Sequence, residues 1–355
     1  MATSQRARWF SNSLTILVFS FLILLFSGCD SSPIPGEAAS DLGNSSQKLE
    51  NQVTTTPIIL PPKVDDDENI PVIETPITSI TPEIVGKIVG EDEPLNQNIF
   101  VPLLDFPIPE SGLRSIETTY RFGSTLFGER IPHDGVEMLN PLGTPVLAAE
   151  DGIVFFSGND RSKKWGRFTN FYGNFIIIQH QINEISQPIY TLYAHLSELL
   201  VQEGDAVSSG QTIGLVGATG KAFTNHLHFE VRVGDFLLQN ARNPELYLPL
   251  IPTEDQPDMG ILIGSLISQK GNPISGISVV IQRVLDGEIQ RGSAIYIETY
   301  AKVISGDQDW QENFVASNLP AGDYRVSAFA YQYFVEKYIT IKPNEFVHVI
   351  LQPEE

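Results

Sequence analysis

The chain has 355 residues, which is enough for two folded domains, and 42% of them are hydrophobic, an ordinary share for a globular protein. Its formal net charge of −21 argues against the basic surface that a nucleic-acid-binding protein needs, so no nucleic-acid partner is expected. The charge also argues against binding to anionic polymers or lipid headgroups by charge alone. A single cysteine excludes any disulfide within the chain.

Residues 1–29 resemble a bacterial lipoprotein signal peptide. Arg6 and Arg8 supply a basic start, and the apolar run that follows, residues 14–26, is too short for a comfortable membrane span. A Ser-Gly pair directly precedes Cys29, as in the lipobox, where the cysteine is lipidated and becomes the mature N-terminus. The resemblance implies a protein of the bacterial cell envelope, outside the cytoplasm and anchored to a membrane through Cys29. A simple signal peptide or an uncleaved anchor is the alternative.

Residues 30–100 are predicted to form a disordered, acidic tether rich in Pro and Thr. Residues 30–95 hold 13 acidic and 3 basic side chains, so −10 of the net charge lies here. Such a segment buries too little apolar surface to fold, and its like charges keep it extended. A short apolar stretch, residues 84–90, leaves open a small strand or a docking segment.

Residues 101–250 are predicted to form one β-rich domain, with turns of Gly, Asn and Ser between its strands. The candidate strands are TPVLAAEDGIVFFSG, NFIIIQH, PIYTLYAHL, QTIGLVG and HLHFEVRV. Only residues 197–202 are expected to carry a short helical turn. A weak repeat relates residues 143–154 to residues 204–214, and it suggests a duplicated, curled antiparallel sheet. The predicted fold class is all-β.

The last of these strands places two histidines on one face. Side chains on a strand point alternately to opposite sides, so His226 and His228 share a face while Leu227, Phe229 and Val231 line the other. Two imidazoles on one face of a strand can hold a metal, or one can bind the metal while the other handles a proton.

Two more histidines occur beside polar residues. Glu137 follows His133 by four residues, and Gly135 between them permits a close approach. His195 ends an alternating strand and is expected on the same face as Tyr193. Two histidines and a carboxylate make the ligand set of a catalytic zinc site, and two further histidines could orient a water and move protons. The alternative is that these histidines are structural.

These motifs resemble, in their order, those of the M23 metallopeptidases of the LytM and lysostaphin type, whose fold is the duplicated hybrid motif. The resemblance covers residues 118–248 and includes the HDGVE, GTPV, YAHLS and HLHFEVR segments. It implies zinc held by His133, Glu137 and His228, with His195 and His226 flanking the metal-bound water as general base and transition-state stabiliser. It also implies hydrolysis of peptide bonds in the cross-bridges or stem peptides of peptidoglycan.

The sequence departs from the family pattern at two positions. Glu137 stands where the family usually has Asp, but either carboxylate binds zinc at about 2.0–2.2 Å, so a shifted site is expected. Asn225 stands where Pro is common, and its effect should stay within the local turn. Asp134 is a rival ligand, although on an extended chain it would face away from His133.

Four other polar residues have simpler interpretations. His180 is expected to have a structural role at a strand end, and His348 a surface or packing role. Glu230 and Arg232 share the face of the two strand histidines, where they either orient a ligand histidine or form a structural pair.

Residues 258–355 resemble a carboxypeptidase-regulatory-like, transthyretin-like β-sandwich. Two strands are expected around the Gly-Asn-Pro turn at residues 271–273, and an LPAGDY segment follows at residues 319–324. The resemblance concerns the fold and says little about function. Wall or glycan binding and a stabilising spacer both remain open for this part.

The sequence therefore predicts a secreted, lipid-anchored zinc metalloendopeptidase that remodels bacterial peptidoglycan. One alternative is an M23-like regulator that activates a separate wall amidase, and another is a peptidoglycan-binding module. The complete set of candidate ligands favours the enzyme. The oligomeric state is not indicated.

Overall fold

The structure, a computed structural model, describes residues 98–183 and 185–354. The predicted signal peptide, Cys29 and nearly all of the predicted tether lie outside these residues. The described residues belong to one compact unit, and their regular secondary structure is almost entirely β-strand, as predicted. None of the helices among them is long and apolar enough to cross a membrane. Below, residues 98–250 are called the N-terminal lobe and residues 258–354 the C-terminal lobe.

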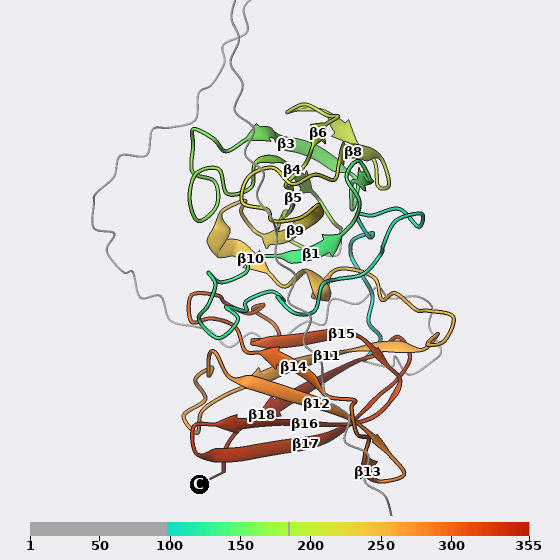
Figure 1. Ribbon diagram of the computed structural model, residues 1–355, viewed down its shortest axis with the longest axis vertical. Coiled ribbons are helices and arrows are strands. Elements are labelled where there is room, and N and C mark those ends of the chain that lie inside the picture. The colour runs from blue at the N-terminus through green and yellow to red at the C-terminus, as the bar shows by residue number, and fades with distance from the viewer. Residues whose placement is uncertain (1–97, 184, 355) are drawn as a thin grey trace, which may run out of the picture. The chain divides into compact units, whose positions relative to one another are not determined.

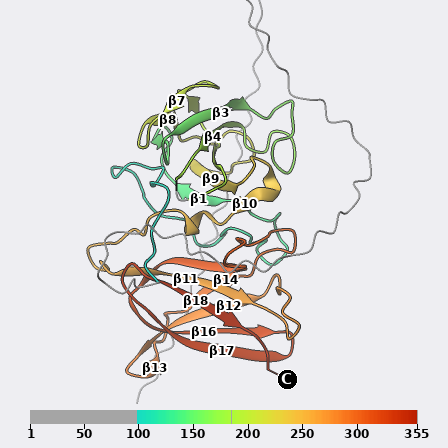
Figure 2. The ribbon, with the colours of Figure 1, turned by 180° about the vertical axis from the view of Figure 1, so that it is seen from behind.

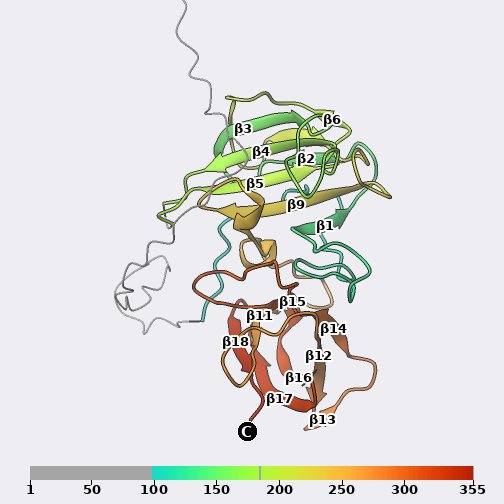
Figure 3. The same cartoon turned by 90° about the vertical axis from the view of Figure 1, so that its left-hand side faces the viewer.

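A seven-stranded antiparallel sheet forms the frame of the N-terminal lobe (Figure 1). Its order is β1-β9-β5-β4-β3-β7, with β10 paired to β9, and Figure 3 shows β9, β5, β4 and β3 side by side in a curled layer. The strands are β1 (Val136–Leu139), β3 (Gly152–Asn159), β4 (Asn174–His180), β5 (Ile189–Ala194), β7 (Ala206–Val207), β9 (His226–Val233) and β10 (Ala241–Arg242).

A second, three-stranded sheet in this lobe has the order β2-β8-β6, with β2 (Pro145–Leu147), β8 (Thr212–Leu215) and β6 (Glu198–Leu199). The two halves of the sequence repeat exchange strands between the sheets. Strand β2 of the first half pairs with β8 of the second, and β7 of the second half pairs with β3 of the first. Neither half could complete its sheets alone, which explains why the repeat folds as one curled body.

The prediction of a helical turn at residues 197–202 is wrong. The Ser197 N–H donates to the Leu215 carbonyl at 2.9 Å, and the Leu200 N–H donates to the Ile213 carbonyl at 2.8 Å. Because these backbone donors are used in pairing with β8, they cannot form helical hydrogen bonds. The described helices are two short 3-10 turns that the sequence did not predict, η1 (Leu238–Asn240) and η2 (Pro244–Leu246).

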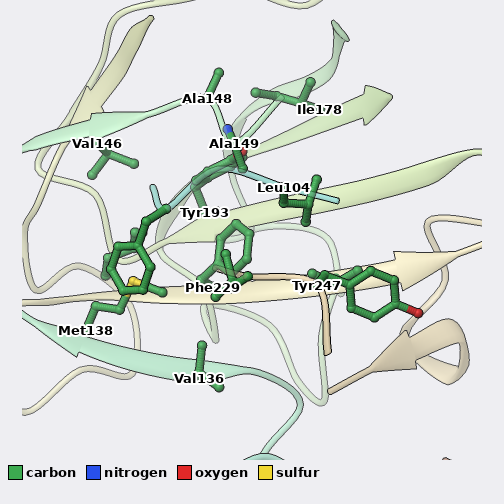
Figure 4. Packing of buried hydrophobic residues seen from close by; sticks show 14 of the residues in the cluster. Leu104, Val136, Met138, Val146, Ala148, Ala149, Ile178, Tyr193, Phe229 and Tyr247 are labelled. Atoms are coloured by element: carbon green, nitrogen blue, oxygen red, sulfur yellow. Dashed lines mark hydrogen bonds between the residues drawn. The ribbon is translucent and has the colours of Figure 1, made fainter. Parts of the chain in front are cut away.

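The apolar face of β9 packs into the main hydrophobic core, as its alternation predicts. Leu227, Phe229 and Val231 are each fully buried there. Figure 4 shows Phe229 next to Tyr193 of β5, and the two ring centroids lie 5.3 Å apart. Burying such a side chain stabilises the fold by about 1.5–3 kcal/mol, so the core fixes the register of β9 and hence the position of its polar face.

The C-terminal lobe contains two further sheets, seen from behind in Figure 2. One has the order β15-β11-β18, and the other has the order β13-β12-β16-β17 with β14 paired to β12. The strands are β11 (Met259–Leu266), β12 (Ser278–Leu285), β13 (Glu288–Ile289), β14 (Ile295–Glu298), β15 (Phe314–Pro320), β16 (Gly322–Ala330), β17 (Tyr333–Ile341) and β18 (Phe346–Leu351).

Strand β11 has three features that the sequence analysis did not address. It pairs with β18 in parallel, and the predicted Gly-Asn-Pro turn leads from β11 to β12 in the other sheet, not into a hairpin. It is also buried on both faces. Leu262 and Leu266 belong to the core of the C-terminal lobe, whereas Ile261 and Ile263 belong to the cluster that contains Leu246 of the N-terminal lobe. The two lobes therefore share an apolar contact.

Candidate functional site

Three side chains predicted as metal ligands meet where β1 lies beside β9. The antiparallel register places Glu137 of β1 directly opposite His228 of β9, and His133 comes just before β1. The His133 Nε2 lies 2.9 Å from Glu137 Oε1 and 3.3 Å from His228 Nδ1, and the third distance, His228 Nδ1 to Glu137 Oε1, is 3.3 Å. These residues form a group that could hold a metal ion.

Hydrogen bonds to the far side of each imidazole decide which nitrogen faces the group. The His133 Nδ1 donates to the Tyr120 carbonyl at 2.7 Å, and the His228 Nε2 donates to Glu230 Oε1 at 3.0 Å. Because a carbonyl or carboxylate oxygen accepts, each neutral ring keeps a bare lone pair on its other nitrogen. Two lone pairs and a carboxylate oxygen therefore converge on one point.

The donor set fits a zinc ion by residue type and by spacing. Ligands bound at about 2.0–2.2 Å in a tetrahedron lie about 3.4 Å from one another. The three distances of 2.9, 3.3 and 3.3 Å are close to that value. His133 and His228 are almost fully buried, and Glu137 is partly exposed, so the group is open on one side only.

Glu137 also contacts a third histidine of the site, His226. Its second oxygen, Oε2, lies 2.6 Å from His226 Nε2, while His226 Nδ1 donates to the Thr224 carbonyl at 2.8 Å. Burial raises the pKa of Glu137, but the neighbouring imidazoles of His133, His226 and His228 outweigh it and hold that pKa well below its usual range. Glu137 therefore contacts the two other candidate ligands through Oε1 and His226 through Oε2.

His195 reaches the site by a backbone turn that the sequence did not predict. Strand β5 ends at Ala194, and His195 adopts a left-handed conformation with φ of +64°. The expectation that His195 shares a face with Tyr193 is therefore wrong, because Tyr193 lies in the core and the His195 ring centroid lies 4.8 Å from that of His226. A non-glycine residue in this conformation is unusual and costs about 1–3 kcal/mol, which the surrounding contacts must offset.

The His195 ring is held with one nitrogen turned toward the other histidines. Its Nδ1 donates to the Thr219 carbonyl at 2.8 Å, so a neutral ring has its lone pair on Nε2. Burial, and then the charges of His228 and His226, lower the pKa of His195 to about 3. The ring is therefore neutral at neutral pH.

A buried network behind His228 fixes its orientation. Glu230 accepts from His228 Nε2, from the Tyr172 hydroxyl at 2.7 Å and from Arg232 Nε at 2.8 Å, and its side chain is fully buried. Burial raises the pKa of Glu230, but the Arg232 charge and the His228 hydrogen bond bring it down to about 2. Burial lowers the pKa of His228, yet the Glu137 and Glu230 carboxylates raise it to about 10, so a metal ion bound at Nδ1 would displace a proton from that nitrogen.

Asp134 does not reach the ligand group. Arg167 holds its carboxylate with Nε at 2.8 Å and Nη2 at 2.6 Å, and the same Nε donates to the Pro132 carbonyl at 3.0 Å. Gly135 has the role predicted for it. A Cβ at this position would lie 2.4 Å from the Phe229 carbonyl oxygen, so only glycine lets the chain pass this close to β9.

A chain of aromatic and basic side chains begins at His133 and leads to the surface. The Tyr120 ring stacks on His133 with centroids 4.3 Å apart, and the Arg130 guanidinium lies 5.1 Å from the Tyr120 ring and 5.9 Å from that of Phe223. Phe223 is 81% exposed, with the Lys221 ammonium 5.6 Å from its ring. We call Tyr120, Arg130, Lys221 and Phe223 the rim.

The two segments that carry the rim, together with residues 160–173, expose mainly basic side chains although the chain as a whole is acidic. Residues 118–135, 160–173 and 217–225 expose one acidic side chain, Glu129. The exposed basic side chains on them are Arg130, Arg161, Lys163, Lys164 and Lys221. A local excess of positive charge raises the concentration of anionic groups near the site.

The remaining two histidines lie apart from this group. His180 is fully buried, with Nδ1 2.9 Å from the Asp151 carbonyl and Nε2 2.7 Å from the Thr191 hydroxyl, and burial lowers its pKa. His348 is exposed on β18 beside Trp310. These positions agree with the structural and surface roles expected for them.

Sequence reasoning missed several partners that set the geometry. The carbonyls of Tyr120, Thr219 and Thr224 orient three imidazoles, and any residue type can supply a carbonyl. No sequence pattern could have identified them. Tyr172 lies far from His228 in sequence, and only pairing within the sheet brings it to Glu230.

Comparison with known proteins relates this part of the chain to a family of peptidases. Residues 131–244 match the family model described as peptidase family M23, so an M23 peptidase family domain is present there. The chain is 39% identical over 102 residues to the peptidoglycan DD-endopeptidase ShyA of Vibrio cholerae, covering 29% of this chain and 20% of that protein. It is 40% identical over 114 residues to the DD-carboxypeptidase/endopeptidase Mpg of Neisseria meningitidis, covering 32% and 23%.

The chain thus spans between a fifth and a quarter of the length of these curated relatives. Among solved structures, the catalytic domain of the antimicrobial peptidase lysostaphin from Staphylococcus simulans is 33% identical. That similarity covers 32% of this chain and 76% of that domain, with a TM-score of 0.27.

Proposed function

We propose that this protein is a zinc-dependent endopeptidase that hydrolyses peptide bonds in peptidoglycan. The observation that carries the proposal is the convergence of His133 Nε2, Glu137 Oε1 and His228 Nδ1, with His195 and His226 beside them. The family match supports the same substrate class. So do the names of two relatives, a peptidoglycan DD-endopeptidase and a DD-carboxypeptidase/endopeptidase.

The chemistry follows from the state in which each side chain is held. Bound zinc would act as a Lewis acid that makes water nucleophilic near neutral pH and polarises the scissile carbonyl. His133, Glu137 and His228 would hold the ion, and Glu230 would keep His228 in the tautomer with Nδ1 facing it. Outer partners of this kind are part of the site, because they fix ligand orientation.

The two other histidines would handle the proton and the developing charge. The hydrogen bond from its Nδ1 to the Thr219 carbonyl leaves the Nε2 of His195 free to accept a proton from water, so we assign His195 as the general base. His226 presents Nε2 beside Glu137, where a protonated ring would stabilise negative charge on the carbonyl oxygen.

The test uses purified peptidoglycan sacculi with the wild-type protein and with His228→Ala, each with and without a zinc chelator. New free amino groups that disappear on chelation and in the variant are the expected result. Zinc binding without release of amino groups from several types of sacculi would contradict the endopeptidase. That outcome would favour the regulator of a separate amidase.

We also propose that the protein is anchored to a membrane of the bacterial envelope through lipidated Cys29, with residues 30–100 as a tether. The support is the lipobox-like sequence alone, since these positions lie outside the described residues apart from 98–100. Cys29→Ser should release the protein from the membrane fraction into the soluble fraction. A variant that stays in the membrane would refute the anchor.

For the folded part, we propose two domains at residues 101–250 and 258–355, the second a transthyretin-like sandwich. Two separate sheets around one cluster of buried side chains in the C-terminal lobe support this assignment. The two domains share an apolar contact through β11.

A further inference from the structure

The C-terminal lobe is fastened to one particular loop of the N-terminal lobe, residues 121–131, which we call the ligand loop because His133 follows it. Glu298 at the end of β14 accepts four hydrogen bonds from this loop. Its Oε2 accepts from the Ser124 hydroxyl at 2.7 Å, the Thr125 N–H at 2.9 Å and the Phe127 N–H at 3.1 Å, and its Oε1 accepts from the Thr125 hydroxyl at 2.7 Å. Glu298 is only 7% exposed, so this carboxylate has been removed from water to serve the loop.

A single residue, Ser124, links Glu298 to His133 through hydrogen bonds. Ser124 donates its hydroxyl hydrogen to Glu298, and its carbonyl accepts the His133 N–H at 3.0 Å. Gly123 forms a second link, because its carbonyl accepts the Ala301 N–H and its own N–H donates to the His133 carbonyl, both at 2.8 Å. The backbone of His133 is thus bonded on both sides to residues that the C-terminal lobe holds.

Packing makes this contact specific. Gly123 has a φ of +78°, and a Cβ there would lie 2.4 Å from Tyr300 Cδ1. Tyr300 also meets Phe122 edge to face, with ring centroids 5.1 Å apart, and is almost fully buried. The close approach of Gly123 to Tyr300 leaves the loop little freedom to slide.

The loop has a conformation that needs outside support. Leu126 and Phe127 are consecutive non-glycine residues with φ of +50° and +55°, a region that such residues rarely occupy. Conformations of this kind persist only where contacts with the surrounding structure hold them in place. The Phe127 N–H is one of the groups that Glu298 binds, so the carboxylate acts at the strained point itself.

From these contacts we infer that Glu298 is a positioning residue of the metal site and that the C-terminal lobe is a working part of that site. Glu298 holds the ligand loop, and the loop holds the backbone of His133. The inference rests on the proposed metal site. It gives the C-terminal lobe a function other than a spacer or a wall-binding module.

The test measures binding of Co²⁺ alone to the full chain, because the visible absorption of this ion reports the geometry of its ligands. We compare wild type with Glu298→Ala, Glu298→Gln and Glu288→Ala, an exposed glutamate of the same lobe. Outer partners of metal ligands typically contribute about 10–100-fold to affinity, and the lower end, about tenfold, is expected for Glu298→Ala, with an altered spectrum. Glutamine retains one acceptor, so Glu298→Gln should recover part of the affinity, and Glu288→Ala should equal wild type.

A folded Glu298→Ala protein with wild-type Co²⁺ affinity and spectrum would overturn the inference. If that variant does not fold, the double variant Ser124→Ala/Thr125→Val decides by the same criteria. It removes the two hydroxyl donors to Glu298, which are also the acceptors of the Leu126 and Gly128 N–H groups, and it leaves the Thr125 and Phe127 N–H donors to Glu298 in place. Failure of the wild-type chain to bind Co²⁺ would refute the metal site itself and the proposed function with it. The two failures are therefore distinguishable.

Discussion

His195 and His226 are held in the same way by one loop. Each ring donates its Nδ1 hydrogen to a backbone carbonyl at 2.8 Å, that of Thr219 for His195 and that of Thr224 for His226, and the ring centroids lie 4.8 Å apart. Both rings therefore turn Nε2 toward the ligand group. Neither ring belongs to the group of candidate ligands, so this pair of imidazoles is suited to proton transfer and charge stabilisation beside a metal.

This arrangement predicts that His195→Ala separates catalysis from metal binding. Loss of a general base typically costs about 10²–10⁴-fold in rate, so kcat on sacculi should fall by that factor while zinc content stays at the wild-type level. Amino-group release and metal analysis of the purified protein measure the two quantities. His348→Gln, on the exposed face of β18, is the matched control and should change neither. Loss of zinc from His195→Ala would show instead that His195 is a ligand.

Glu230 is predicted to control metal affinity through His228. Glu230→Gln weakens the acceptor of the His228 Nε2 hydrogen, and zinc affinity should fall by about 10–100-fold. Tyr172→Phe removes one donor to Glu230 and keeps the carboxylate, so its effect should be smaller. Competition with a chromogenic chelator gives both affinities. Because Glu230→Gln also leaves Arg232 without its buried partner, circular dichroism must first show a folded variant. A folded Glu230→Gln protein with the zinc affinity of the wild type would contradict the assignment.

The rim predicts an effect on substrate binding without an effect on stability. Phe223 is 81% exposed, and the cations of Lys221 and Arg130 lie within 6 Å of its ring. We expect a ring this exposed to contact the substrate, and a contact worth about 0.5–1 kcal/mol changes a binding constant about two- to fivefold, so Phe223→Ala should raise KM by about that factor with kcat unchanged. Initial rates on a soluble cross-linked peptide give both constants. Tyr331→Ala, a similarly exposed aromatic of the C-terminal lobe, should leave KM unchanged. A fall in kcat for Phe223→Ala would place the ring in catalysis instead.

The buried side chain of Glu312 should make the free energy of unfolding depend on pH. This side chain is only 2% exposed, and burial raises its pKa from 4.5 to about 7. Between these values the folded chain keeps a proton that the unfolded chain has lost, so the contribution of Glu312 to stability falls as pH rises and is constant above about pH 7. A shift of this size corresponds to about 3 kcal/mol.

The measurement compares wild type with Glu312→Gln by urea unfolding at pH 5 and pH 7.5. The free energies of unfolding should differ little at pH 5, and the variant should be the more stable by up to about 3 kcal/mol at pH 7.5. Glu288→Gln, an exposed glutamate, should follow wild type at both values. A constant difference between Glu312→Gln and wild type across this range would show that Glu312 titrates normally.

Much of the site could be predicted from the sequence because it depends on residue types at fixed spacings. A period of two put His226 and His228 on one face of β9, and the hydrophobic effect decided which face was buried. The three expected ligands meet as the motif implied, and the substitution of Glu for Asp at position 137 has not moved that carboxylate away from the histidines. Local pattern and side-chain chemistry sufficed for these features.

The tertiary structure decided how each group is oriented. Nothing in the sequence indicates that His195 leaves its strand with a positive φ, that Arg167 turns Asp134 away from the ligands, or which carbonyls accept from the imidazoles. Nor does it indicate that Glu298, 165 positions after His133, supports the ligand loop. The physical reason is the same in each case. A strand pattern fixes which side of a sheet a residue faces, whereas ring orientation and loop conformation depend on hydrogen-bond partners that meet only when distant segments pack together.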